Sequence, residues 1–299
     1  MMTINFCRNL YTNNTFMLWL IVILTYLYLN NNIPKKYILS YILLVTLVVI
    51  NKQVKIENFD NNKVKRINYN NLTKKQLYKI IHGNKPCIFT HFLNKKELKK
   101  VTMKNFCNTL SNIKVKVRYN NYGDINGSDN RKFYKIKLKD YYKKLIKNKF
   151  KDKRNPDYVG NNKIKLEHLE RCGITKNRSL FKKLPNAKMW IGPADSKTPL
   201  HKDQPSNLAL QLYGKKEWIV FPKKDIKYLC YKEKNKELEW SGYDIYNKKS
   251  CETAEKAKRY NIILNAGEML YLPKQWSHHV RNITDSIMVN FWYNNKLKI

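Results

Sequence analysis

The chain begins with two stretches in which almost every position is apolar. Residues 16–29 (FMLWLIVILTYLYL) and 37–50 (YILSYILLVTLVVI) are uncharged runs of 14 residues, joined by a short polar link. Both are apolar on every side, whereas a helix that covers a globular core is apolar along one stripe. A helix of about 14 residues is short for a hydrocarbon layer ~30 Å thick, so each would have to continue into its flanks. The pattern favours a transmembrane helical hairpin or a single anchor over residues 16–50, with core helices as the alternative.

The middle of the chain, residues 51–185, mixes helical and strand patterns. Thr73 is a suitable N-cap for a helix that continues to Ile81. Two further stretches have helical spacing, and two have the alternation or the short apolar run of a strand. The predicted helices are 93–110 and 140–148, and the predicted strands are 85–89 and 113–119. We therefore expect an α/β support region.

Strand patterns dominate from residue 186 to the end. Short apolar segments are separated by Gly turns and Pro stops, which is typical of a β-sandwich or jelly roll. The segments are AKMWIG, NLALQLYG, KEWIVFP, NIILNAGEMLYLP and SIMVNFWY. Residues 224–259 interrupt them with a charged insertion that we expect to be a loop with some helix.

The patterns together predict a mainly β fold with flanking helices. Its parts are an N-terminal tail (1–15), the hydrophobic helical hairpin (16–50), the support region (51–185) and a jelly-roll core (186–299).

The charge of the chain changes this picture little. There are 59 Lys and Arg against 22 Asp and Glu, a formal net charge of +37, and only 9 of the basic residues are Arg. Lys, Asn, Ile and Tyr have A/T-rich codons, so compositional bias explains most of the charge. Proteins that bind nucleic acids use Arg as well, for its bidentate hydrogen bonds. A real anionic partner, RNA or an acidic membrane surface, is the alternative.

The six cysteines contain no C-x-x-C pair and no zinc-site spacing. A chain of this length does not depend on disulfide bonds for stability. We therefore expect reduced thiols, in a domain that faces the cytosol.

The stretch TPLHKDQPSNLALQLYGKK (198–216) carries the first candidate chemistry. His201 and Asp203 are separated by one residue, so on a strand their side chains point to the same face. A second segment, QWSHHV (275–280), places His278 just before another apolar strand. Two imidazoles and one carboxylate can hold one face of an octahedral Fe(II) ion and leave three positions open. For each residue alone, a polar patch on a strand is the alternative.

Four more polar residues accompany this candidate metal site. Gly214 predicts a hairpin turn that returns the chain alongside itself and brings Lys216 to the same cavity. A buried Lys needs an anionic partner, which a dicarboxylate would supply. Thr198 offers a hydroxyl to the same carboxylate, and Asn207 and Asn290 offer amides nearer the metal.

These segments resemble the Jumonji-C and cupin-like Fe(II)/2-oxoglutarate oxygenases over about residues 186–293. The resemblance rests on T-x-x-H-x-D, an Asn four residues after the Asp, Gly-x-Lys and P-x-x-W-x-H, all of which are present. They are most similar to the hydroxylase branch that includes the asparaginyl hydroxylase of hypoxia-inducible factor. The resemblance implies a double-stranded β-helix, the jelly roll of cupins, for the core.

The resemblance also implies a role for each residue of the motif. The iron ligands would be His201, Asp203 and His278. The residues that hold 2-oxoglutarate would be Lys216, Thr198, Asn207 and Asn290, together with Tyr158 upstream. The spacing after Trp276 favours His278 over His279, which would face the opposite side of a strand.

The function implied is an Fe(II)- and 2-oxoglutarate-dependent dioxygenase. It would use O2, convert 2-oxoglutarate into succinate and CO2, and hydroxylate a protein side chain. Two alternatives stay open: a hydroxylase of RNA (of the tRNA type) in the same family, and a catalytically silent jelly-roll binding module at a membrane. The intact set of metal ligands argues against the silent module. With the hydrophobic hairpin, we expect a membrane-associated enzyme whose catalytic domain faces the cytoplasm. The sequence does not indicate the oligomeric state.

Overall fold

The computed structural model describes residues 63–294 except 120–132, 148–149, 151–155, 176–179, 181–186 and 232–237. In this part of the chain no helix is both long and apolar enough to cross a membrane. The predicted hairpin at residues 16–50 lies outside the described residues, so it stays a prediction, as do the predicted domain boundaries.

The first described helix begins where the sequence predicts. In α4 (Lys74–Ile81) the Thr73 hydroxyl accepts a hydrogen bond from the Gln76 N–H, and the Gln76 side chain accepts one from the Thr73 N–H. This reciprocal pair satisfies two N–H groups that a helix start leaves without partners. Leu77 and Ile81 face the core, while most of the other positions are exposed.

The helix predicted over residues 93–110 is two helices, α5 (Lys95–Lys100) and α6 (Met103–Thr109). Val101 ends the first, and Thr102 caps the second, because the Thr102 hydroxyl accepts from the Asn105 N–H at 3.1 Å. The remaining α-helices in the described part are α7 (Leu138–Ile146) and α8 (Leu166–Arg171).

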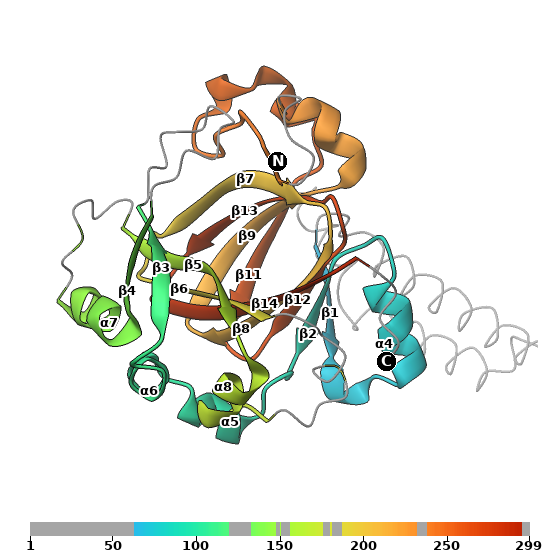
Figure 1. Cartoon of the computed structure of the whole chain (residues 1–299). Coiled ribbons are helices and arrows are strands. Elements are labelled where there is room, and N and C mark those ends of the chain that lie inside the picture. The colour runs from blue at the N-terminus through green and yellow to red at the C-terminus, as the bar shows by residue number, and fades with distance from the viewer. Residues whose placement is uncertain are drawn as a thin grey trace, which may run out of the picture. The chain divides into compact units, whose positions relative to one another are not determined.

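The described strands form two sheets that face each other (Figure 1). The larger sheet has the order β1 (Lys65–Asn68), β2 (Cys87–Thr90), β12 (Met269–Leu272), β8 (Ser206–Tyr213), β14 (Ser286–Tyr293), β6 (Ala187–Gly192), β5 (Tyr158–Ile164), β3 (Lys114–Arg118), β4 (Phe133–Lys137). The smaller has the order β10 (Leu238–Trp240), β7 (Lys197–Asp203), β13 (Ser277–Asn282), β9 (Lys215–Phe221), β11 (Tyr260–Asn265). The fold is mainly β and of the jelly-roll type, as predicted.

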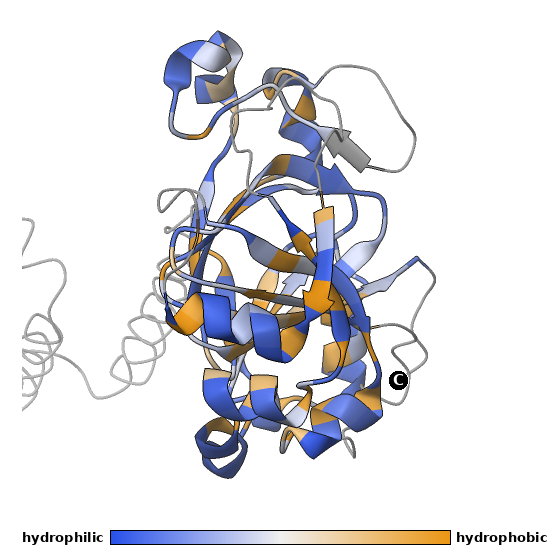
Figure 2. Ribbon diagram, turned by 60° about the vertical axis from the view of Figure 1, so that its left-hand side comes forward, coloured by the Kyte–Doolittle hydropathy of each residue, from blue (hydrophilic) through white to orange (hydrophobic). Residues whose placement is uncertain are grey.

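Alternating side chains connect the layers of the fold. In β8, Leu208 and Leu210 pack in the group that contains Phe106 of α6, whereas Ala209 packs with Trp218 of the smaller sheet. Successive residues of a strand point to opposite faces, so one strand serves both the helix layer and the space between the sheets. Figure 2 shows the helices as mainly hydrophilic with hydrophobic patches, as expected for helices that bury one face. The helices α5, α6, α7 and α8 lie on the outer side of the larger sheet (Figure 1).

The predicted hairpin at Gly214 is wrong. The turn leads from β8 in the larger sheet to β9 in the smaller sheet, so the two strands are not neighbours. Gly214 has φ +73°, and a Cβ there would lie 2.0 Å from the Asp285 carbonyl oxygen, so only glycine fits. Lys216 therefore reaches the space between the sheets from the sheet opposite β8.

The insertion covers the outer face of the smaller sheet. Its elements are η3 (Lys223–Tyr228), β10, η4 (Lys248–Ser250) and η5 (Glu252–Lys256), and Tyr243 and Ile245 pack on Ile219. Cys230 and Cys251 form a disulfide in it, with Cα atoms 6.0 Å apart. The prediction of reduced thiols is wrong for this pair, because the fold of the insertion brings together cysteines 21 residues apart.

The other three described cysteines, Cys87, Cys107 and Cys172, are free and buried. Burial raises the pKa of Cys107 and of Cys172 to about 12, so these two thiols stay protonated at neutral pH.

Candidate metal centre

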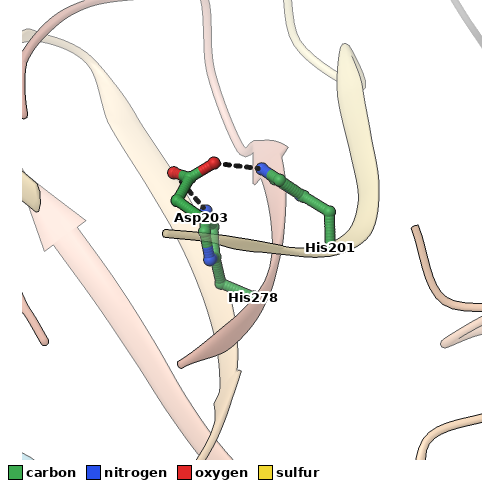
Figure 3. A group of neighbouring side chains, drawn as sticks. All are labelled: His201, Asp203 and His278. Carbon is green, nitrogen blue, oxygen red and sulfur yellow. Dashed lines mark ion pairs between the residues drawn. The ribbon is translucent and has the colours of Figure 1, made fainter. Parts of the chain in front are cut away.

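Two neighbouring strands of the smaller sheet bring three potential metal ligands together. His201 and Asp203 lie at the end of β7, two residues apart and on the same face. His278 lies at the start of β13, directly opposite His201 in the antiparallel pair. In Figure 3 the three side chains point toward one another.

The distances suit a single ion. The His201 Nε2 atom is 3.9 Å from one carboxylate oxygen of Asp203, and the His278 Nε2 atom is 3.7 Å from the other. The potential ligand atoms of the three residues all lie within 4.8 Å of one another. Two histidines and one carboxylate that share one side of an ion are the ligand set of non-haem Fe(II) sites.

Backbone carbonyls orient both imidazoles. The Nδ1–H of His201 donates to the Pro199 carbonyl at 2.8 Å, and that of His278 donates to the Trp276 carbonyl at 3.1 Å. A carbonyl can only accept, so the proton is on Nδ1 in each neutral ring. The Nε2 lone pairs are therefore available at the point where the three side chains meet.

Tryptophans hold the three ligands from the sides. The Trp292 indole N–H donates to Asp203 Oδ2 at 3.0 Å. Trp240 of the insertion stacks on His201 with ring centroids 4.8 Å apart, and Trp218 stacks on His278 at 5.5 Å. These contacts restrict the rotation of the ligand side chains.

His279, the other candidate in the SHHV segment, faces away from this cluster. In the pairing with β9, His278 is opposite Val220, which packs between the sheets, and His279 is opposite Ile219, which packs under the insertion. Burial, with nearby cations, lowers the pKa of His279 to about 3, so its imidazole is neutral. Its ring lies edge-on to Tyr246, with centroids 5.4 Å apart.

Lys216 is a buried cation in the same cavity. It is 5% exposed, and burial lowers its pKa to about 7. The ammonium donates to the Asn282 side-chain oxygen, and among the described residues it has no ion pair. Asn282 is itself held by hydrogen bonds from its NH2 group to the Gly192 and Pro193 carbonyls, at 3.1 and 2.9 Å. A charge of this kind favours an anionic ligand.

Two hydroxyls lie at this end of the cavity. The Tyr158 and Thr198 oxygens are 2.8 Å apart in a hydrogen bond. The Arg118 guanidinium donates to the Tyr158 hydroxyl at 3.5 Å and lies over the Trp190 ring, 4.9 Å from its centroid.

The two asparagines project from the larger sheet into the cavity. The Asn290 NH2 group donates to the Asn207 side-chain oxygen at 2.9 Å. Within the described part of the chain, the Asn207 NH2 group and the Asn290 oxygen are buried without a hydrogen-bond partner. Buried polar groups are nearly always paired, so these two are positioned for a ligand or water.

A single cavity between the sheets contains every residue of the predicted site. It is lined by Tyr158, Trp190, Ser196, Thr198, His201, Asp203, Asn207, Lys216, Trp218, His278, Val280, Asn282, Met288, Asn290 and Trp292. Sequence reasoning missed Asn282 and Trp292, which hold Lys216 and Asp203. A polar residue at the end of the SHHVRN strand was the available indication for Asn282.

A family model described as a cupin-like domain matches residues 73–299, which include all of the candidate site residues. JmjC domain-containing protein A of Dictyostelium discoideum is 26% identical over 249 residues, 77% of this chain and 96% of that protein. Lysine-specific demethylase JMJ30 of Arabidopsis thaliana is 35% identical over 115 residues, 38% of this chain and 27% of that protein.

The human bifunctional peptidase and (3S)-lysyl hydroxylase JMJD7 is 31% identical over 134 residues, 37% of this chain and 42% of that protein. The chain spans less than half of the length of JMJ30 and of JMJD7. None of the three names refers to RNA or to a membrane, so these comparisons lend no support to the predicted RNA and membrane partners.

The Trp292–Asp203 hydrogen bond generates a first prediction. Trp292→Phe removes the donor that fixes the carboxylate, and we expect Fe(II) affinity to fall by roughly tenfold. Anaerobic competition with a chromophoric chelator measures it. The control is Trp190→Phe, because the Trp190 N–H has no hydrogen-bond partner within the described residues. Equal affinities in the two variants would contradict the role given to Trp292.

The lowered pKa of Lys216 generates a second prediction. At pH 8 the side chain is mostly neutral, and a carboxylate in contact with it raises its pKa, so binding takes up about one proton. Near pH 6 the side chain is already charged, so the uptake disappears. Calorimetry of glutarate binding in buffers of different ionisation enthalpy measures this. We expect Lys216→Met to abolish the proton uptake. If glutarate binds the unchanged protein at pH 8 without proton uptake, its carboxylate does not contact Lys216.

Proposed function

The chain belongs to the family of cupin-like domains, and from this premise we propose that it is an Fe(II)- and 2-oxoglutarate-dependent dioxygenase that hydroxylates a protein side chain. The observation that carries the proposal is the group His201, Asp203 and His278, which shares one cavity with the buried Lys216.

The three ligands fit Fe(II) by number, type and orientation. Two neutral imidazoles and one carboxylate would hold one face of the ion and leave the opposite face to other ligands. When bound, Fe(II) supplies the redox chemistry that couples the conversion of 2-oxoglutarate and O2 into succinate and CO2 to hydroxylation of the substrate. The protein keeps the imidazole protons on Nδ1, away from the ion, through the Pro199 and Trp276 carbonyls.

Lys216 and its surroundings fit the distal carboxylate of 2-oxoglutarate. The Asn282 oxygen is a neutral partner, so the ammonium keeps its charge available for an anion. The Tyr158 and Thr198 hydroxyls would add hydrogen bonds to the same carboxylate, as each can turn its proton away from the other. A charge-assisted contact of this kind is about twice as strong as a neutral hydrogen bond.

Asn207 and Asn290 fit the other end of the co-substrate. The NH2 group of the first and the oxygen of the second are without partners among the described residues. They would orient oxygen atoms next to the ion. The apolar walls, which include Trp218, Val280 and Met288, would keep bulk water out of the cavity.

A protein substrate is favoured over RNA. JMJD7 is named as a lysyl hydroxylase and JMJ30 as a lysine-specific demethylase, so both names refer to an amino-acid side chain. The catalytically silent binding module has less support, because the ligand set and the ammonium for the co-substrate are all present and already oriented.

Substitution of the metal ligands tests the proposal. We expect His201→Ala and Asp203→Ala to lower the turnover of 2-oxoglutarate by a hundredfold or more, on the order of 3 kcal/mol of transition-state stabilisation. Succinate formed by the full chain, with Fe(II) and ascorbate present, is the quantity to measure.

The matched control is His279→Ala, which removes a buried imidazole from the same strand but on the side away from the cluster. It should retain turnover within a few-fold, provided that its near-UV circular dichroism is unchanged. Turnover that survives in both His201→Ala and Asp203→Ala would remove the proposed site.

A further inference from the structure

A groove outside the metal cavity carries a concentration of positive charge. Its charged lining residues are Lys85, Lys223, Lys224, Lys258 and Lys274. No Asp, Glu or Arg lines it among the described residues, and none of the five lysines forms an ion pair there. All but Lys258 are exposed.

The groove lies at the end of the jelly roll at which the metal ligands lie. It is lined by the residues where β12 ends and β8 begins, and Asp203 and His278 occupy the equivalent ends of β7 and β13. The two sites have no lining residue in common, but hydrogen bonds connect them. The Gln275 N–H donates to the Asp203 carbonyl at 2.8 Å, and Trp276, which lines the groove, accepts from the His278 ring.

Asp225, an acid beside the groove, forms no ion pair with the five lysines. Asp225, beside Lys224, is buried, and its carboxylate accepts from the Lys258 backbone N–H at 2.9 Å. Like charges that converge on a concave surface raise the local positive potential and attract a complementary anion. The groove therefore favours a ligand with several negative charges.

We propose that this groove binds an acidic segment of the protein substrate, adjacent to the residue that reaches the metal cavity. This proposal rests on the proposed function, which supplies the protein substrate. Extended peptides that carry Asp or Glu present several negative charges in a row, and the groove offers five lysines from four separate segments of the chain. The segment would fix the substrate in front of the cavity by charge, so that selection does not depend only on the hydroxylated side chain.

The lining favours an acidic peptide over single-stranded RNA. Recognition of single strands uses exposed aromatic rings on which bases stack. Here Trp276, Tyr271 and Tyr293 are buried, and both tyrosine hydroxyls donate to carbonyls at 2.6 Å. The partly buried Tyr260 ring is covered by the Lys258 ammonium, 5.1 Å from its centroid. The His82 ring stacks on Tyr78 with centroids 4.0 Å apart, so each described ring of the groove is buried or already covered on one face.

The test is fluorescence anisotropy of labelled decaglutamate with the full chain at low salt, without metal or 2-oxoglutarate. The groove variant carries Lys223→Gln, Lys224→Gln and Lys274→Gln. An exposed ion pair contributes about two- to threefold in affinity, so we expect this variant to bind about tenfold more weakly.

The matched control carries Lys95→Gln, Lys96→Gln and Lys99→Gln, which removes the same charge from α5. These three lysines are exposed, and the start of α5 lies at the other end of the jelly roll, where the Leu93 N–H donates to the Gly267 carbonyl. We expect the control to bind within about twofold of the unchanged protein.

Three outcomes overturn the proposal. They are no binding of decaglutamate, equal losses in the two variants, and tighter binding of labelled dodecauridylate that is lost in the groove variant. The last would make the groove a nucleic-acid site. Binding of decaglutamate in the groove without 2-oxoglutarate turnover would contradict the proposed function but not the acidic-peptide site. Turnover without binding in the groove would contradict the acidic-peptide site but not the proposed function.

Discussion

The pairing of β7 with β13 is the constraint on which the candidate site depends. It places His201 opposite His278, and the two-residue period of β7 adds Asp203 on the same face. A shift of one residue in the pairing of either strand would turn the metal ligands of that strand toward the insertion, the side to which His279 points. The register is fixed by burial on both faces of the smaller sheet, with Val220 on one side and Ile219 on the other.

The second constraint is the burial of a positive charge. Lys216 occupies the space between the sheets with a neutral partner, Asn282, at the cost of desolvating an ammonium. The metal ligands and this ammonium both project from the smaller sheet, and the asparagine pair projects from the larger one. The cavity thus has a place for a metal ion and a place for an anion.

Local pattern was enough to predict the jelly-roll strands, the Thr73 cap and the shared face of His201 and Asp203, because strand period and capping act over a few residues. His278, on another strand, was assigned through the family resemblance. Local pattern did not predict contacts between segments that are distant in the sequence. The turn at Gly214 looks the same in sequence whether the next strand pairs with β8 or crosses to the other sheet. The disulfide of the insertion and the Trp292–Asp203 hydrogen bond depend likewise on the tertiary fold.

An anaerobic titration of the full chain with Fe(II) and 2-oxoglutarate tests the central claim most directly. The chelate has a visible charge-transfer band, which reports the metal and the co-substrate in one site. We expect a band for the unchanged protein, a weaker one for Lys216→Met at the same 2-oxoglutarate concentration, and none for His278→Ala. No band from well-folded protein, or a band unaffected by His278→Ala, would contradict it.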